Sequence, residues 1–149
     1  MSETVARWPA NRKHAELEVR VATNPEETDA LFRLRHEIYV EEIGLYPPDH
    51  PYVHDGRVFD PYDDWSTHLM LYVDGVLKGG IRFTERRENR LELDDFTPLA
   101  RETPDPYRTA EITRFMIRRD VRGTFASSIL MEAIWQVMSN AGCRYSRPV

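Results

Sequence analysis

Apolar and polar residues alternate along the first part of the chain in a pattern that predicts one strand and one helix. Residues 1–15 are polar and irregular, and we expect them to form a flexible N-terminal arm. Alternating apolar residues from Glu16 to Ala22 predict a strand. Asn24-Pro-Glu-Glu27 has the N-cap, proline and acidic residue of a helix start, and we expect Gly44 to end that helix. The residues expected to face inward from it are Leu31, Phe32, Leu34 and Ile38.

A long irregular segment interrupts this pattern before a hairpin restores it. Residues 46–64 are rich in Pro, Asp, His and aromatic side chains and have no clear period, and loops of this length are often functional. Residues 67–73 and 77–84 then predict two strands joined by an Asp74-Gly75 turn. A further short strand is expected at 90–93.

The last third of the chain predicts a strand, a helix and another strand. The apolar residues of 110–118 change phase part-way, which predicts a strand with a bulge. Residues 124–140 predict a helix closed by Gly142, and Cys143 is expected to begin the next strand. The order of these elements predicts a single α/β (α+β) domain over residues 16–149. The residues expected to face inward from the helix are Phe125, Ile129, Leu130, Ala133, Ile134 and Val137.

Composition narrows the classes of function. The formal net charge of −5 argues against a general nucleic-acid binder. No apolar stretch reaches the roughly 20 residues that span a bilayer and the N-terminus has no apolar signal core, so we expect a cytoplasmic protein. Cys143 is the only cysteine, which excludes an intrachain disulfide and a cysteine-based zinc site. All 20 basic residues except Lys13 and Lys78 are arginine, which reflects either codon usage or bidentate binding of carboxylate or phosphate.

The segment just before the hairpin concentrates the candidate chemistry. Within nine residues it holds three carboxylates and an imidazole, those of Asp60, Asp63, Asp64 and His68. Carboxylates this close repel one another unless cations face them. The candidate cations are Arg35, Arg82 and Arg114. Two other interpretations stay open: turn and cap hydrogen bonds, or a metal-dependent hydrolase that uses Asp60, Asp63 and His68. A calcium loop of the EF-hand type is missing its turn glycine, and the other histidines have no metal-binding spacing.

Five motifs occur in an order that resembles a known enzyme group. They are Arg35-His-Glu-Ile-Tyr39, Asp60-x-x-Asp63, Gly80-Ile-Arg82, Phe96 and Glu111-Ile-Thr-Arg114. The element order resembles the Gcn5-related N-acyltransferase (GNAT) superfamily, and the motifs resemble its autoinducer (acyl-homoserine-lactone) synthases. Ser66-x-His68 and Tyr39-Val-Glu-Glu42 look closer to N-acyl amino acid synthases and exosortase-associated acyltransferases. The resemblance covers residues 31–142 and implies a mixed, mostly antiparallel sheet flanked by helices.

The resemblance also implies an activity and a set of roles. The group transfers a fatty acyl chain from a thioester on acyl carrier protein or coenzyme A to an amine, without a tightly bound cofactor. It implies that Glu111 orients or deprotonates the amine, with Arg114 beside it and His68 as a second candidate base. Glu111 and Arg114 lie at odd spacing on one strand, so a bulge is required to bring them to one face. The implied substrate-binding residues are Arg35, Tyr39, Asp60, Asp63, Arg82 and Phe96.

Two departures from the group bear on the substrates. Leu45 stands where acyl-homoserine-lactone synthases usually have a tryptophan, so an amino acid or another amine is expected as the acceptor rather than S-adenosylmethionine. The phosphate-binding loop has a single glycine, and Phe125 stands where a second would let the backbone approach a pyrophosphate. A single phosphopantetheine phosphate fits this loop better, which favours acyl carrier protein as donor and partner. The donor-binding residues expected there are Arg118, Arg119, Arg122 and Gly123.

Relatives continue past the point where this chain stops. Val149 falls at the start of the strand after the second helix, and the C-terminal elements of the fold are expected to be missing. Either the chain is a fragment, or a second copy or another partner chain completes the sheet, because proteins rarely leave a strand edge bare. A non-catalytic GNAT-like module that binds an acyl ligand or a partner is therefore the alternative to an enzyme.

Overall fold

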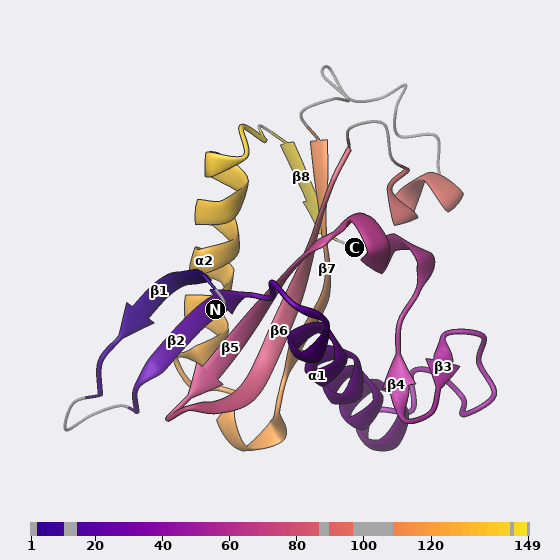
Figure 1. The fold of residues 1–149 in the computed structure, drawn as a ribbon, viewed down its shortest axis with the longest axis horizontal. Helices are drawn as coiled ribbons and strands as arrows, with labels where there is room; N and C mark the ends of the chain where they lie inside the picture. Colours follow the sequence, from indigo (N-terminus) through magenta and orange to yellow (C-terminus); the bar gives the residue numbers. More distant parts are fainter. Residues whose placement is uncertain (1–2, 11–14, 87–89, 97–108, 144, 149) are drawn as a thin grey trace.

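The computed structural model describes residues 3–10, 15–86, 90–96 and 109–143, and the backbone of 145–148. Its centre is a six-stranded sheet in the order β1-β2-β5-β6-β7-β8 (Figure 1). All neighbouring strands are antiparallel except β7 and β8, which are parallel. The predicted mixed, mostly antiparallel sheet is confirmed. Its strands are β1 (Glu3–Trp8), β2 (Leu17–Val21), β5 (Thr67–Val73), β6 (Val76–Glu85), β7 (Thr109–Ile117) and β8 (Tyr145–Pro148).

Helices lie on both faces of this sheet. α2 (Ala126–Asn140) packs on one face, and α1 (Pro25–Arg35) lies on the other (Figure 1). α1 runs directly into a π-helical segment, η1 (His36–Glu42). Outside the main sheet, β3 (Val53–His54) and β4 (Arg57–Val58) form a small hairpin. The other elements within the described residues are the short 3₁₀ helices η2 (Pro61–Trp65), η3 (Glu92–Asp95) and η6 (Arg119–Val121).

The predicted start of α1 is confirmed at the level of its cap. Asn24 has an extended backbone conformation, and its side chain accepts a hydrogen bond from the Glu27 N–H at 2.9 Å. The helix continues beyond Arg35 as η1, and the chain turns away at Gly44, which has a φ of +68°. That left-handed conformation suits glycine, as the sequence predicted.

The period of two along the central strands separates an apolar face from a mixed one. Leu69 and Leu71 of β5 pack in the core beneath α2. Met70, between them, packs with α1 on the opposite face. His68 and the cross-strand Arg82 share that second face with Met70, since side chains two apart in a strand point the same way. The polar site is therefore built on the α1 side of the sheet.

The N-terminal segment was predicted wrongly as a flexible arm. Residues 3–8 form β1, which pairs with β2 along the edge of the sheet. Thr4 donates a hydrogen bond to Glu18 at 2.7 Å, and Val5 and Trp8 pack against the core. The segment looks irregular in sequence because it is an edge strand with a shifted register between Thr4 and Ala6. Residues 1–2 and 11–14 lie outside the described residues.

Three further predictions need correction. Phe125 does not face inward: its side chain is 74% exposed just before α2 begins. Residues 90–93 are not a strand, since η3 covers Glu92–Asp95. The segment 46–64 is not wholly irregular, because it contains the β3–β4 hairpin and most of η2. Both η2 and η3 begin with hydrogen bonds from backbone N–H groups to aspartate side chains, a pattern that has no periodic signature.

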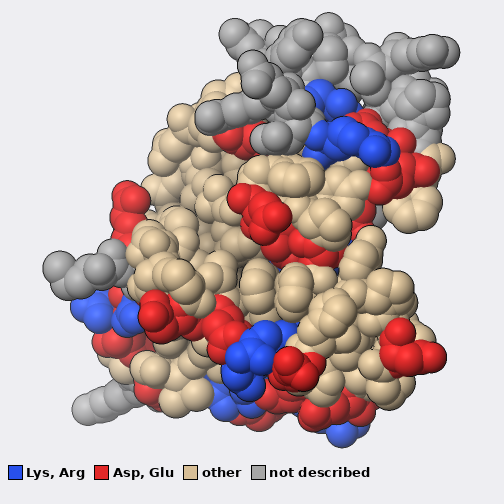
Figure 2. Space-filling model, turned by 45° about the vertical axis from the view of Figure 1, so that its right-hand side comes forward, with Lys and Arg blue, Asp and Glu red and all other residues tan. Residues whose placement is uncertain are grey.

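The surface carries both signs of charge close together. In Figure 2 basic and acidic side chains lie next to each other over the described part of the face shown. The net charge of −5 is therefore not gathered there into one acidic patch. Among the described residues, no helix is both long and apolar enough to cross a membrane.

Candidate active site

The acidic segment forms a capped 3₁₀ turn whose carboxylates also face the protein interior. Asp60 is the N-cap of η2, and its Oδ1 accepts the Tyr62 N–H at 2.9 Å. Asp63 reaches back, and its Oδ2 accepts the Asp60 N–H at 2.8 Å. Both aspartates are buried. Asp60 and Asp63 therefore have both predicted roles: they cap the turn, and they bind cations.

Arg35 enters this turn from the end of α1. Its Nη1 donates to Asp63 Oδ2 at 2.8 Å, and the residue is only 1% exposed. Its Nη2 lies 3.4 Å from Nδ1 of His68. The other ring nitrogen, Nε2, lies 3.3 Å from the Asp63 carbonyl oxygen. A neutral His68 protonated at Nε2 satisfies both neighbours, because it donates to the carbonyl and accepts from the guanidinium.

Arg82 is the centre of the cluster, with its residue fully buried. Nη1 donates to Asp60 Oδ1 at 2.7 Å and to Asp63 Oδ1 at 3.0 Å. Nη2 donates to Glu92 Oε2 at 2.7 Å, and Nε donates to Thr113 Oγ1 at 2.8 Å. Every nitrogen of this guanidinium thus has an acceptor, which is the condition under which a buried charge is tolerated.

Arg114 joins the cluster because the strand that carries it is bulged. Arg82 pairs with Thr113 across the β6–β7 ladder, whereas Gly80 pairs with Met116, so β7 has one extra residue between these positions. Arg114 itself has a φ of +55°, a left-handed conformation that is uncommon outside glycine. Its Nη2 donates to Asp60 Oδ2 at 2.5 Å and to Glu92 Oε1 at 2.8 Å. The predicted bulge is confirmed, and it turns Arg114 towards the face that holds Arg82.

Glu111 lies next to the cluster and holds η3 in place. Its two carboxylate oxygens accept the backbone N–H groups of Glu92, at 2.8 Å, and Leu93, at 2.6 Å. The residue is fully buried. Burial raises the pKa of its carboxyl group, although the two N–H donors act in the opposite direction. Glu111 therefore fixes the position of Glu92, which contacts both Arg82 and Arg114.

The electrostatics of the cluster keep its members in defined protonation states. Burial alone would raise the pKa of Asp63, but the charges and hydrogen bonds of Arg35 and Arg82 outweigh burial and hold that pKa well below its usual range. Burial and the nearby Arg35 charge lower the pKa of His68 to about 4. Burial would lower the pKa of Arg114, but Asp60 and Glu92 outweigh it and raise that pKa. At neutral pH His68 is uncharged, while Asp63 and Arg114 are ionised.

A cavity lined with aromatic rings opens beside Glu92. It has a volume of about 380 Å³. Phe96, one of the predicted substrate residues, lines it and is 77% exposed. Tyr39, another of them, packs its ring 6.2 Å from that of Tyr46 at the cavity wall. Its wall also includes His50, Tyr52, Tyr62 and Asp95.

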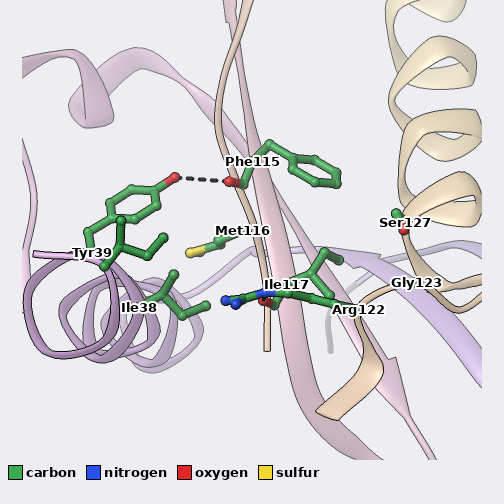
Figure 3. Close-up of a pocket in the computed structure, with 9 residues that line it drawn as sticks. Ile38, Tyr39, Phe115, Met116, Ile117, Arg122, Gly123 and Ser127 are labelled. Atoms are coloured by element: carbon green, nitrogen blue, oxygen red, sulfur yellow. Dashed lines mark hydrogen bonds between the residues drawn. The ribbon is translucent and has the colours of Figure 1, made fainter. Parts of the chain in front are cut away.

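A second cavity lies on the other side of the bulge, between η1, β7 and the start of α2 (Figure 3). Its volume is about 180 Å³. Tyr39 donates a hydrogen bond to the Phe115 carbonyl oxygen at 3.0 Å, at the edge of this cavity (Figure 3). Arg122 and Gly123, both predicted to bind the acyl donor, line it. Tyr39 of this cavity packs against Tyr46 of the aromatic cavity, so the two cavities are lined by neighbouring rings.

The other residues predicted for the donor differ in position. Arg118 forms an ion pair with Glu37 of η1 at 2.7 Å. Arg119 is exposed at the start of η6 and does not line the cavity. Phe125, which stands at the position of a second loop glycine, has an exposed side chain at the start of α2. Of the four residues, Arg122 and Gly123 are the ones that the structure places against the cavity.

Comparison with known proteins identifies the family. Residues 34–132 match the acetyltransferase (GNAT) domain family. The chain belongs to this family. The predicted fold class is confirmed. The matched range contains the bulged strand β7 and the first part of helix α2.

Similar proteins include acyl-homoserine lactone synthases. The chain is 32% identical over 114 residues to the isovaleryl-homoserine lactone synthase of Bradyrhizobium diazoefficiens, covering 74% of this chain and 51% of that protein. A CoA-dependent acyl-homoserine lactone synthase, BjaI, solved with SAM and isopentyl-CoA, is 26% identical with a TM-score of 0.65. That comparison covers 81% of this chain and 57% of BjaI. The chain thus spans about half the length of the curated relative that it matches.

A further structure shares the fold. FeeM, an N-acyl amino acid synthase from uncultured soil microbes, is 20% identical with a TM-score of 0.69, over 90% of this chain and 71% of FeeM. These comparisons confirm the resemblance to autoinducer synthases in sequence and fold, and to an N-acyl amino acid synthase in fold.

The GNAT chain brings most of the sequence-predicted residues into one cluster. Glu92 and Thr113 were missed, although each contacts Arg82. Thr113 lies inside the Glu111-Ile-Thr-Arg114 motif, two residues from Glu111, so the period of a strand could have identified it. Glu92 lies in a segment that was taken for a strand, and the sequence has no periodic signal for its position. The members of the cluster that were predicted are Arg35, Asp60, Asp63, His68, Arg82 and Arg114.

Metal binding is not how the acidic residues are used. The carboxylates of Asp60 and Asp63 face guanidinium groups, and His68 faces Arg35. In the described part of the chain no group of three or more His, Cys, Asp or Glu side chains is arranged to hold a metal ion. The metal-dependent hydrolase considered from the sequence therefore has no ligand set at these residues.

Proposed function

We propose that this GNAT chain transfers an acyl group from a thioester to the amine of an amino acid or a related α-amine. The observation that carries the proposal is a pair of neighbouring cavities, one lined by Tyr39 and the bulge residue Phe115, the other by Tyr46, whose ring packs against that of Tyr39. The cavity that Arg122 and Gly123 line is suited to the phosphate-bearing arm of a donor. The aromatic cavity beside Glu92 is suited to the acceptor, because carboxylates and ring faces attract an ammonium group.

The proposed reaction needs a stabilised oxyanion at the thioester carbon. The amine nitrogen attacks this carbon, the C–N bond forms, the C–S bond breaks, and a proton from the amine ends on the thiol that leaves. Arg114 and Phe115 have no partners in the β6–β7 register, so a backbone N–H at the bulge is in a position to donate to the oxyanion. Tyr39 holds the Phe115 carbonyl and so fixes the orientation of that backbone. Burial raises the pKa of Tyr39, which keeps its hydroxyl protonated as a donor.

The acceptor side has a separate requirement. An α-amine has a pKa near 8, so only about a tenth of it is neutral at pH 7. In our proposal Glu111 is a positioning residue for this side, since it holds η3 and thereby directs Glu92 towards Arg82 and Arg114. The prediction from sequence that Glu111 itself removes the amine proton is the competing role. The two roles differ in kinetics, because loss of positioning raises the acceptor KM, whereas loss of a base lowers kcat at unchanged KM.

The donor is proposed to be coenzyme A or acyl carrier protein. BjaI, the solved neighbour at 26% identity, is CoA-dependent, which favours coenzyme A. The single glycine of the loop before α2 favours a single phosphate, as on a carrier protein. For the acceptor, the curated relative is a homoserine lactone synthase, so S-adenosylmethionine is tested beside free amino acids. Leu45 is exposed and does not line the aromatic cavity, so it does not decide between them.

The test follows thiol release and product mass. Short- and long-chain acyl-CoA and acyl carrier protein are each incubated with the chain and a panel of amino acids and S-adenosylmethionine. We expect thiol release above background with one donor and an acylated amine in the mass spectrum. Arg114→Ala should lower kcat/KM at least about 100-fold, the scale of losing a group that shapes an oxyanion site. Glu111→Gln should raise the acceptor KM without changing donor binding.

The competing function is a module that binds an acyl ligand without transferring it. The single glycine of the loop before α2 favours this alternative. Donor binding with no thiol release for any acceptor would establish it and reject the transferase.

A further inference from the structure

Arg122 is held in one orientation and its free end is occupied by a carboxylate. Nε donates to the Ile117 carbonyl oxygen at 2.8 Å, which anchors the guanidinium on the end of β7. The two Nη groups both donate to Glu42, with Nη2 and Oε2 3.0 Å apart. This is a bidentate contact between a guanidinium and a carboxylate, and a phosphate binds a guanidinium with the same geometry.

The contact joins a residue that lines the cavity beside β7, Arg122, to the end of η1. Arg122 extends from the segment before α2 across the cavity towards η1 (Figure 3). Glu42 is the last residue of η1, so the contact ties η1 to the loop. The Arg118–Glu37 ion pair joins the same two segments.

Glu42 lies at the C-terminal end of η1, where an acidic side chain is electrostatically unfavourable. The C-terminal end of a helix carries partial negative charge, and the last turn of η1 contains no basic residue. The hydrogen bond from Arg122 lowers the pKa of the Glu42 carboxyl, so it is ionised at neutral pH. The side chains of Arg122 and Glu42 are 38% and 27% exposed, and ion pairs this exposed are weak and easily exchanged.

We propose that Glu42 is a displaceable substitute for a donor phosphate on Arg122, and so a determinant of donor affinity. The proposal rests on the proposed function in one respect, that a phosphate-bearing thioester enters this cavity. When the donor arrives, its phosphate takes the two Nη groups of Arg122, and the end of η1 that carries Glu42 is released. The carboxylate then remains near the phosphate and repels it, which sets an upper limit on the affinity for highly charged donors.

The test measures binding of coenzyme A by calorimetry to the wild-type chain and to Glu42→Gln. We expect Glu42→Gln to bind coenzyme A about two- to fivefold more tightly, the range set by an exposed ion pair. Pantetheine, which has no phosphate, should bind both proteins equally. Glu26→Gln is the matched control, because it makes the same substitution and the same change in net charge at an exposed residue in the first turn of α1. It should bind coenzyme A like the wild type.

A second pair of variants separates the contact from a general charge effect. In an Arg122→Ala background the gain from Glu42→Gln should shrink, because no guanidinium remains to be released. An equal gain in both backgrounds, or coenzyme A affinity in Glu42→Gln equal to or below that of the wild type, overturns the proposal. So does the absence of coenzyme A binding in both proteins.

Binding and turnover keep this proposal distinct from the proposed function. Tighter coenzyme A binding by Glu42→Gln without acyl transfer supports the role of Glu42 and rejects the transferase. Acyl transfer with unchanged coenzyme A binding in Glu42→Gln supports the transferase and rejects the role of Glu42.

Discussion

At the scale of single residues, the cluster is a set of buried charges that satisfy one another. Arg82 has an acceptor for each of its nitrogens. By contrast, the Nε atoms of Arg35 and Arg114 are buried without a hydrogen-bond partner among the described residues. Such groups cost free energy and commonly occur where structure serves a function. The cluster is therefore better explained by positioning than by stability, since apolar residues of similar size often replace buried ion pairs without loss.

His68 makes protein stability depend on pH in a defined window. Its pKa is about 4 in the folded protein and near 6.5 when unfolded, so between these values the unfolded chain binds more protons. Stability from His68 is complete above pH 6.5 and is lost as the pH falls towards 4. Arg35, Arg82 and Asp63 surround the ring, and burial and the arginines outweigh the aspartate.

We expect the wild type to lose on the order of 2 kcal/mol more than His68→Gln between pH 7 and pH 5. Urea unfolding of both proteins at the two pH values measures this difference. The same pH dependence in both would show that His68 is not the titrating group.

The residue types of the cluster could be predicted from sequence, but their contacts could not. The closely spaced aspartates predicted that cations would face them, and Arg35, Arg82 and Arg114 form those ion pairs. Glu92 and Glu42 were missed because each acts from the end of a short or irregular element. Long-range contacts of such residues depend on packing that has no local signal.

At the scale of elements, the β7 bulge resolves a conflict that the sequence already contained. Glu111 and Arg114 lie at odd spacing, and the extra residue in β7 brings both side chains to the α1 face. The period of two in a strand predicted that the two side chains would lie on opposite faces, and it also predicted that a bulge would bring them to one face. No such rule predicted η1 or η3, because a π-helical turn and a capped 3₁₀ turn depend on tertiary contacts.

Strand β6 approaches β7 closely opposite the end of the bulge. A Cβ added at Gly79 would lie 2.7 Å from the Met116 carbonyl oxygen and 2.8 Å from Ile117 Cδ1. We expect Gly79→Ala to lower the free energy of unfolding by about 1–3 kcal/mol, the range for overpacking. Val76→Ala, at an exposed position of the same strand, should change it by less than about 0.5 kcal/mol. Chemical denaturation measures both, and equal small effects would mean that β7 shifts freely.

At the scale of the whole molecule, one sheet lies between the α1 layer and the α2 layer. β1 lies at one edge, the site forms on the α1 face, and α2 covers the other face (Figure 1). We propose that the described elements form one domain, because the core cluster runs from β2 through β7 to α2. The family match begins at residue 34 and so leaves out β1, β2 and most of α1, which the sheet and the core nevertheless include.

The three tryptophans allow this proposal to be tested. Trp8 ends β1, Trp65 ends η2 in the site, and Trp135 lies in α2. Three variants that each retain one tryptophan should show the same denaturant midpoint by fluorescence, after allowance for the substitutions, as by circular dichroism. An earlier midpoint for Trp65 would show that the site layer unfolds separately.

The choice of arginine for the buried cations has a consequence for alkaline conditions. A buried lysine loses its proton as its pKa falls, whereas a guanidinium stays protonated throughout the range in which proteins remain folded. The α-amine that we propose as acceptor, in contrast, becomes a better nucleophile as the pH rises past 8. Under this proposal, Arg35, Arg82 and Arg114 keep their charges in alkaline solution while the amine loses its proton.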